Sequence, residues 1–355
     1  MENGRPTWFL DAPLKDTPYL SRVSHTINLS EGGAVTKSGV RLLKNIAKRT
    51  LPPILVDAGK WVRDKTCRSR LSLSEPEWEY IPEGWERQRV DPHIKGWNVA
   101  RVLEACKAKW PAFVKALEGN GPLGVSHEAT TISTDNYSFH NTIMCYAYVL
   151  TLTARSKERV SILDWGGGIG HYYLISKAVL PGVEILYHCK DLPVLCAHGR
   201  KLFPEARFYE DESFLEQSYD LVLASASLHY SEKWSHRFRQ LASVTKSQMY
   251  VTRLPVVFHS PSFVVLQRAY NFGYDTEYLG WFLNRDEFLQ CASDAGMRLM
   301  REFLIDERPS FVYGAPELGE YRGFLFQPFR RGESSNGWEA KCLITYYRNW
   351  TSTLF

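Results

Sequence analysis

The stretch ILDWGGGIGHYY (162–173) places four glycines within five positions, directly after an apolar run that ends in Asp164. Glycine has no Cβ, so its backbone can approach a ligand closely and can adopt positive φ angles. The run VSILD (160–164) predicts a short buried strand, and residues 169–180 predict a helix. A strand, a glycine-rich loop and a helix in this order are typical of a loop that holds a nucleotide-like cofactor.

The composition indicates a packed globular protein. The chain has 355 residues, of which 44% are apolar and 14% aromatic, enough for one large domain with an appendage or for two domains. A formal net charge of +4 is too small to indicate a nucleic-acid partner, so none is expected. The seven cysteines show no metal-type spacing, and no signal peptide is recognisable. We therefore expect a cytoplasmic protein with reduced thiols.

A basic stretch early in the chain predicts contact with a membrane surface. Ten Lys and Arg residues lie between Lys37 and Arg70, against two Asp. The segment RLLKNIAKRT (41–50) places apolar residues on one helical face and basic residues on the other, and a second such face follows Pro52-Pro53. Residues 41–65 therefore predict peripheral contact with the inner face of an anionic membrane. A solvated helical hairpin packed on the domain is the alternative interpretation.

The patterns along the chain predict five segments. They are a loosely ordered amino-terminal part (1–36), the basic amphipathic segment (37–75), a helical cap or lid (76–155), a core domain (156–330) and a carboxyl-terminal extension (331–355). No oligomeric state follows from these patterns.

From residue 158 onward, apolar strands alternate with helices. The predicted strands are 160–164, 183–189, 206–211, 219–226, 248–254, 297–305 and 323–329. This alternation predicts an α/β fold, with an open parallel sheet covered by helices on both faces. Right-handed crossovers place the ligand site of such a sheet at the carboxyl ends of its strands.

The glycine spacing separates two kinds of cofactor. A dinucleotide site needs G-x-G-x-x-G, but His171 or Tyr173 stands where the third glycine would have to be. The first motif of Rossmann-like methyltransferases that use S-adenosylmethionine is matched instead, by Asp164-x-Gly166-x-Gly168-x-Gly170. That cofactor has no phosphate, and an acid at the strand end can order the loop and face its ammonium group.

Two further acidic positions extend the predicted cofactor site. Asp191 lies 21 residues beyond Gly170, just past the second strand, where a carboxylate can accept hydrogen bonds from ribose hydroxyls. Asp211 or Glu212, after the third strand, is expected to accept from an adenine amino group, with Phe214 against the ring. Taken singly, each acid also fits a surface carboxylate in a loop. The predicted cofactor-binding residues are Asp164, Gly166, Gly168, Gly170, Asp191, Leu192, Asp211, Glu212 and Ser225.

These motifs together resemble those of class I methyltransferases. DWGGGIGHYY (164–173) followed by DLPVL (191–195) resembles small-molecule O-methyltransferases, in which a D-L-P box follows the second strand. Over most of residues 40–305 the chain is similar to a little-characterised bacterial methyltransferase family whose members often accompany surface-polysaccharide genes. The resemblance implies a Rossmann-like fold and S-adenosylmethionine as the cofactor, but no particular substrate. Such relatives tend to carry Gln at the position of His229.

Two residues are candidates for catalysis. An alcohol acceptor has to lose a proton, and His229, after the fourth strand, is placed to act as the general base; contact with the cofactor or a helix cap are its alternatives. Arg253, at the end of the fifth strand, is expected to bind a carboxylate or phosphate of the acceptor, or to form a structural ion pair. Asp135 and His140 lie in a polar stretch that is either a lid or an ordinary loop.

An aromatic stretch after the fifth strand either stacks on a sugar or ring substrate or belongs to the core. It contains Tyr270, Tyr274, Tyr278 and Trp281.

The loop after the fourth strand argues against two kinds of methyltransferase. Nucleic-acid amino-methyltransferases carry an Asn/Asp-Pro-Pro-aromatic box there, whereas this chain has SASL (225–228). Residues 224–230 contain no acid, so a catechol-type Mg²⁺ site is not expected, and no other metal site is predicted.

The sequence therefore predicts an S-adenosylmethionine-dependent methyltransferase. The expected reaction is metal-independent O-methylation of a hydroxyl on a sugar, a glycan or another small metabolite. The alternatives are N- or O-methylation of a natural-product scaffold, a non-catalytic adenosyl-binding scaffold protein, and a membrane-binding module in which residues 41–65 are the function.

Overall fold

The computed structural model describes residues 76–125, 136–305 and 311–329. The chain divides into two compact units, Met1–Ser74 and Glu75–Phe355, and all described residues belong to the second. The predictions for residues 1–36, 37–75 and 331–355, and that for Asp135, fall outside the described residues.

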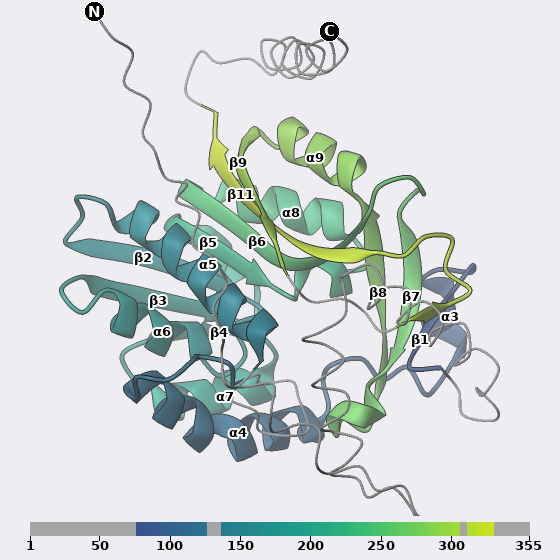
Figure 1. Cartoon of the computed structure of the whole chain (residues 1–355), viewed down its shortest axis with the longest axis horizontal. Helices are drawn as coiled ribbons and strands as arrows, with labels where there is room; N and C mark the ends of the chain where they lie inside the picture. The colour runs from purple at the N-terminus through teal and green to yellow at the C-terminus, as the bar shows by residue number, and fades with distance from the viewer. Residues whose placement is uncertain (1–75, 126–135, 306–310, 330–355) are drawn as a thin grey trace, which may run out of the picture. The chain divides into compact units, whose positions relative to one another are not determined.

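A parallel sheet forms the centre of the described unit (Figure 1). Its five strands lie in the order β4-β3-β2-β5-β6, the doubly wound order in which the first of the five along the chain is central. They are β2 (Arg159–Trp165), β3 (Glu184–Lys190), β4 (Arg207–Tyr209), β5 (Tyr219–Ser225) and β6 (Thr245–Val257). Beyond β6 the sheet continues with two antiparallel neighbours, β11 (Glu320–Pro328) and then β9 (Met297–Leu304).

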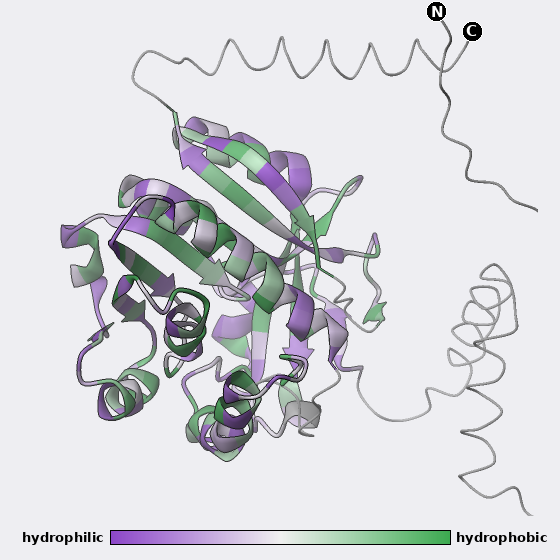
Figure 2. Cartoon of the chain, turned by 60° about the vertical axis from the view of Figure 1, so that its left-hand side comes forward, coloured by the Kyte–Doolittle hydropathy of each residue, from purple (hydrophilic) through white to green (hydrophobic). Residues whose placement is uncertain are grey.

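Helices cover both faces of this sheet. On one face, α5 (Tyr137–Ala154) and α6 (His171–Val179) pack on a core that includes Tyr146, Leu150 and Ile162. On the other face, α8 (Trp234–Ser243) and α9 (Arg285–Asp294) pack on a core that includes Phe238 and Phe288. Figure 2 shows the resulting pattern, with apolar residues along the central strands and mixed colours on the helices. The predicted Rossmann-like α/β fold is thus confirmed for the described residues.

A smaller sheet was not predicted. It consists of β1 (Trp78–Tyr80), β7 (Phe263–Arg268), β8 (Glu277–Asn284) and β10 (Val312–Tyr313), in the order β10-β1-β7-β8. The predicted parallel sheet is confirmed for β2 to β6, whereas the antiparallel pairs β7–β8 and β1–β7 were not predicted. The segment 269–276 that joins β7 to β8 is shorter than the crossover that a parallel pair needs, and β8 meets the central sheet through a parallel pairing with Val256 and Val257 of β6.

Three further helices complete the part of the unit that bears on the site. They are α3 (Glu86–Val90), α4 (Ala100–Glu118) and α7 (Pro193–Leu202), and α4 lies against α7. The segment 76–155 thus contains strand β1 beside its helices, and its role as a cap stays a prediction. Within the described ranges, no helix has both the length and the apolar character needed to cross a bilayer.

Candidate cofactor and acceptor site

The glycine loop between β2 and α6 is held in a backbone conformation that suits glycine. Gly166, Gly168 and Gly170 have φ angles of +80°, +62° and +101°. A Cβ on Gly166 would lie 2.4 Å from the Cβ of Ser227, and one on Gly170 would lie 2.9 Å from the Phe203 ring. At Gly168 the nearest atom would be 4.0 Å away, so this glycine leaves an open surface. Packing thus explains Gly166 and Gly170, whereas Gly168 presents bare backbone.

Asp164 is buried against the glycine loop. Its side chain is 1% exposed, and it accepts a hydrogen bond from the Tyr187 hydroxyl. A Cβ on Gly167 would lie 2.4 Å from the Asp164 carboxyl carbon, which shows how closely the loop covers the acid. Burial, together with the charge of Asp191, raises the pKa of Asp164 to about 7 against the opposing effect of the Tyr187 bond. This geometry fits the predicted loop-ordering role of Asp164.

Asp191 joins the end of β3 to the glycine loop. One carboxylate oxygen accepts from the Gly168 N–H at 2.6 Å, and the other accepts from the Leu192 N–H at 2.6 Å. Burial raises the pKa of Asp191, while these two backbone hydrogen bonds lower it. Each carboxylate oxygen has a second lone pair, so the group retains capacity to accept from a ligand.

A cavity of about 240 Å³ lies at the carboxyl ends of β2, β3 and β5. Five of the predicted cofactor residues line it: Gly166, Gly168, Asp191, Leu192 and Ser225. Of the predicted aromatic residues, Tyr274 lines it too. Sequence reasoning missed nine further lining residues, which are Trp97, Val102, Cys106, Trp165, Lys190, Leu195, Ala226, Ser227 and Tyr230. Trp97, Val102 and Cys106 precede the glycine loop by more than fifty positions, so no local spacing ties them to it.

The acids predicted for adenine do not line this cavity. Asp211 begins the 3₁₀ helix η1 (Glu212–Glu216) and accepts from the Ser213 N–H at 3.0 Å, and hydrogen bonds from Ser213 lower the pKa of Asp211. Glu212 forms an ion pair with Arg237. Phe214 is fully buried in the core between the sheet and α8. The predicted roles of Asp211 and Glu212 in holding adenine therefore stay predictions, and the observed bonds to Ser213 and Arg237 do not support them.

The two predicted catalytic residues are buried, and neither lines the cavity. His229 lies in the 3₁₀ helix η2 (Leu228–Tyr230), is 2% exposed, and has its ring centroid 3.9 Å from that of Tyr230. Arg253 is 6% exposed and has a φ angle of +53°. The predicted lid residue His140 instead accepts a hydrogen bond from the Leu123 N–H at 3.1 Å. The catalytic roles of His229 and Arg253 stay predictions.

Three aromatic side chains line one side of the cavity, Trp97, Tyr230 and Tyr274, and Tyr278 stacks on Trp97 without lining the cavity; these four are here called the aromatic wall. The Trp97 ring stacks on Tyr278 at 4.2 Å and meets Tyr230 edge-on at 4.9 Å and Tyr274 at 5.9 Å. The wall comes from four parts of the chain, namely the segment before α4, η2, the turn between β7 and β8, and β8 itself.

The other two predicted aromatic residues lie away from this wall. Tyr270 is 49% exposed and donates to Glu277, and Trp281 donates to the Glu232 carbonyl at 3.1 Å.

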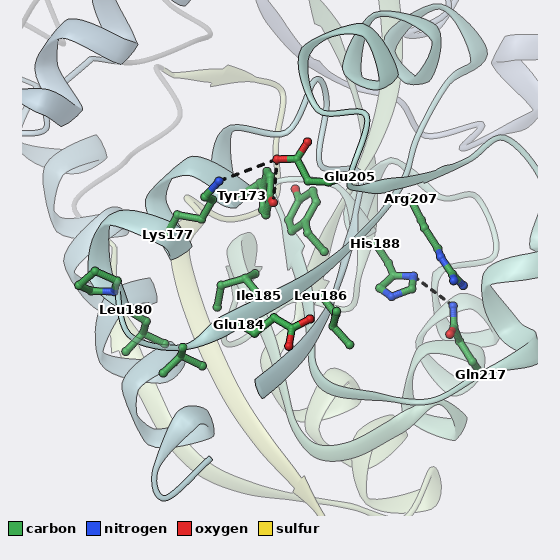
Figure 3. A pocket seen from close by; sticks show the side chains of 13 residues that line it. Tyr173, Lys177, Leu180, Glu184, Ile185, Leu186, His188, Glu205, Arg207 and Gln217 are labelled. Carbon is green, nitrogen blue, oxygen red and sulfur yellow. Dashed lines mark hydrogen bonds and ion pairs between the residues drawn. The ribbon is translucent and has the colours of Figure 1, made fainter. Parts of the chain in front are cut away.

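A second hollow, of about 500 Å³, lies along the outer edge of β3 (Figure 3). There β4 pairs with β3 only from His188 onward, so residues 184–187 have no strand on that side among the described residues. Lys177 and Tyr173 approach Glu205 at 3.8 and 3.0 Å, and Gln217 approaches His188 at 3.1 Å. Burial and the nearby Arg207 lower the pKa of His188 to about 4. No glycine lines this hollow.

Metal ligands do not gather in the described part of the chain. No three side chains of His, Cys, Asp or Glu come together there as a metal site would require. The prediction of a metal-independent reaction is not tested by this observation.

Comparison with known proteins gives likenesses of structure alone. No protein-family model and no curated protein matches the chain. Among solved structures, it is similar to a putative sarcosine dimethylglycine methyltransferase from Galdieria sulphuraria, with 15% identity, 53% of this chain and 85% of that chain covered, and a TM-score of 0.38.

Two further solved structures are similar to this chain to about the same degree. One is the 1,6-didemethyltoxoflavin-N1-methyltransferase from Burkholderia thailandensis, with 14% identity, 68% and 98% coverage and a TM-score of 0.38. The other is an amino pentose methyltransferase from Micromonospora echinaspora, with 12% identity, 54% and 91% coverage and a TM-score of 0.36. TM-scores this low do not establish the fold or the function of this chain. The fold assignment therefore rests on the order of its own strands, and the functional proposal rests on the contacts within its own site.

Proposed function

We propose that the chain is an S-adenosylmethionine-dependent methyltransferase that methylates a hydroxyl of a small acceptor. The observation that carries this proposal is the bond between Asp191 and the Gly168 N–H, at the mouth of a cavity where three parallel strands end. This bond holds a ribose-accepting carboxylate beside a backbone surface with no side chain. A carboxylate after the second strand and a glycine loop after the first are the parts that an adenosyl ligand requires.

The residues around the cavity fit that cofactor better than a dinucleotide. Asp191 would accept from the ribose hydroxyls, Gly166 and Gly168 would offer backbone to the amino-acid end, and Leu192 and Leu195 would pack on the apolar parts. A dinucleotide would require a third glycine at residue 171 or 173, and these positions hold His and Tyr. When bound, S-adenosylmethionine would supply a methyl group already activated by its sulfonium charge.

The chain's own contribution to the reaction is to exclude water and to receive a proton. Val102 and Cys106 of α4 line the cavity and are themselves buried, so this helix helps to shield the site. We keep His229 as the proposed base for the acceptor hydroxyl; its ring contacts Tyr230, which lines the cavity. Arg253 is proposed to position an anionic group of the acceptor.

The finer parts of the proposal rest on sequence alone. A sugar, a glycan or another small metabolite as the acceptor, without a metal, and peripheral contact of residues 41–65 with a membrane are proposed on the patterns and resemblance described above.

Calorimetric titration of the full chain with S-adenosylhomocysteine and, in parallel, with NAD⁺ tests the cofactor. We expect micromolar binding of S-adenosylhomocysteine and no measurable binding of NAD⁺. Tight binding of NAD⁺, or no binding of S-adenosylhomocysteine by protein that circular dichroism shows to be folded, would overturn the proposal.

The role of His229 is tested by turnover once an acceptor is in hand. If His229 is the base, His229→Gln lowers kcat strongly and leaves S-adenosylhomocysteine affinity nearly unchanged. Equal kcat values for the variant and the wild type would remove His229 from the reaction.

A further inference from the structure

The hydroxyl groups that line the cavity are already engaged within the protein. The Ser225 hydroxyl is 2.9 Å from that of Tyr172, and the Ser227 hydroxyl donates to the Trp165 carbonyl at 2.8 Å. The Tyr230 hydroxyl donates to the Gln267 side chain at 3.4 Å. Each of these three hydroxyls thus has one hydrogen bond within the protein, which leaves it less capacity for a ligand than a hydroxyl without such a bond.

The charged groups lie at one end of the cavity. Of the described residues that line it, Lys190 and Asp191 are the ones with a formal charge, and both stand at the end of β3. Tyr230 follows β5, and in the sheet β2 and its glycine loop lie between β3 and β5. The strand order thus places β2 and its glycine loop between the charged residues and Tyr230. If Asp191 holds the ribose, the part of the cavity near Tyr230 is left for the acceptor.

The aromatic wall matches a flat apolar ring and mismatches a polyol. The Trp97 ring lies 4.2–5.9 Å from the other three rings, and Tyr230 lies 5.1 Å from Tyr278, in stacked and edge-on pairs that a further ring can extend. A sugar packed against it would lose hydration from several hydroxyls beside rings that offer few hydrogen-bond partners, and each buried hydroxyl left unpaired weakens binding. The wall thus distinguishes acceptors by the number of hydroxyls that they bury.

We propose that the acceptor is an uncharged planar aromatic ring carrying the hydroxyl to be methylated, and that the aromatic wall is its binding surface. This inference rests on the proposed function and narrows its acceptor from small metabolites in general to aromatic alcohols. Trp97 is the specificity-determining residue, because it contacts the other three rings of the wall and lines the cavity.

The experiment compares matched probes on the full chain saturated with S-adenosylhomocysteine. Calorimetry measures the binding of 2-naphthol, of its saturated analogue decahydro-2-naphthol, and of methyl α-D-glucopyranoside. We expect 2-naphthol to bind about fivefold to tenfold more tightly than the saturated analogue, which has the same carbon skeleton but no π-face, and the glucoside not to bind. Equal binding of the two naphthol compounds, or stronger binding of the glucoside, would overturn the inference.

Variants then assign the preference to the aromatic wall. Trp97→Leu is expected to reduce the ratio of the affinity for 2-naphthol to that for decahydro-2-naphthol to about one, because the stacking surface is lost. Tyr313→Leu removes an aromatic ring that is 58% exposed on β10, and it should leave the ratio unchanged. If Trp97→Leu does not fold, Tyr274→Leu replaces it in the same comparison. A ratio that survives the loss of the wall residue would place 2-naphthol elsewhere and overturn the inference.

The failure of the acceptor inference is distinguishable from that of the proposed function. Binding of S-adenosylhomocysteine without a preference for 2-naphthol contradicts the aromatic acceptor and leaves the methyltransferase proposal standing. No binding of S-adenosylhomocysteine by the folded protein contradicts the methyltransferase proposal itself.

Discussion

The cavity at the carboxyl ends of the strands and the hollow at the edge of β3 differ in backbone conformation and in how their charged groups are bonded. The hollow is the larger, at about 500 Å³ against about 240 Å³, and carries more charged side chains. Three of its charges, however, form ion pairs within the protein, Lys177 with Glu205 and Glu184 with Arg159. The cavity instead has glycines with positive φ angles and a carboxylate fixed by two backbone N–H groups.

This difference teaches that backbone geometry identifies the site better than volume does. A strand edge becomes hollow simply because the neighbouring strand β4 is short. A loop with three positive φ angles that is bonded to a buried acid carries conformational and desolvation costs, and such costs are concentrated at functional sites. The following predictions test whether the cavity, and not the hollow, binds the cofactor.

The largest effect is expected for Asp191→Ala. The variant loses the charge-assisted hydrogen bonds from the carboxylate to the ligand, which contribute about 1.5–3 kcal/mol. We therefore expect S-adenosylhomocysteine to bind about tenfold to a hundredfold more weakly. Calorimetry with S-adenosylhomocysteine measures this, and Arg207→Ala, in the hollow, is the matched control, with an expected change below about twofold. The reverse pattern, in which Arg207→Ala is the damaging change, would place the cofactor in the hollow.

A smaller effect is expected for Gly168→Ala. The added Cβ meets open space, but the φ angle of +62° costs an alanine about 1–2 kcal/mol, so the free energy of unfolding falls by that amount. Urea denaturation measures it, with Gly182→Ala as the control, since no atom lies within 4 Å of a Cβ there and its φ angle is not positive. If both variants are equally stable, the loop does not hold this conformation in solution.

The pH dependence of stability tests Asp164. Its pKa rises from 3.8 to about 7 on folding, so the folded chain binds more protons than the unfolded chain between these values. The wild type therefore loses stability as the pH rises from about 4 to about 7, and Asp164→Asn does not share this loss. Urea titrations at pH 4, 6 and 8 measure the difference between the two proteins. A difference that is independent of pH would mean that Asp164 is already ionised in the folded protein at pH 4.

The smallest effect on the cofactor is expected for Asp211→Ala. This side chain bonds to Ser213 and does not line the cavity, so S-adenosylhomocysteine affinity should change by less than about twofold. A loss of tenfold or more would restore the sequence-based role of Asp211 in holding adenine, and would show that the bound conformation differs here.

Much of the fold and part of the site could be predicted from the sequence because they depend on local pattern. Apolar runs of five to eight residues separated by helical segments predict the parallel strands, since each strand is buried on both faces. The acid and glycines from Asp164 to Gly170, and Asp191 after the next strand, are recognisable because loop conformation and strand ends follow from neighbours in the chain. The predicted adenine contact of Asp211 stays a prediction, because the loop after β4 turns into η1 and Asp211 serves as its cap.

Only the tertiary structure could reveal the aromatic wall and the smaller sheet. Trp97 and Tyr278 stack at 4.2 Å although they are far apart in the sequence, and no periodicity relates them. The smaller sheet joins the central one where β6 extends past β5 and pairs with β8, which local patterns do not show. The sequence by itself thus determined the fold class and the glycine loop after β2, since both arise from short-range backbone preferences. The surface that would choose the acceptor was decided by packing between distant segments.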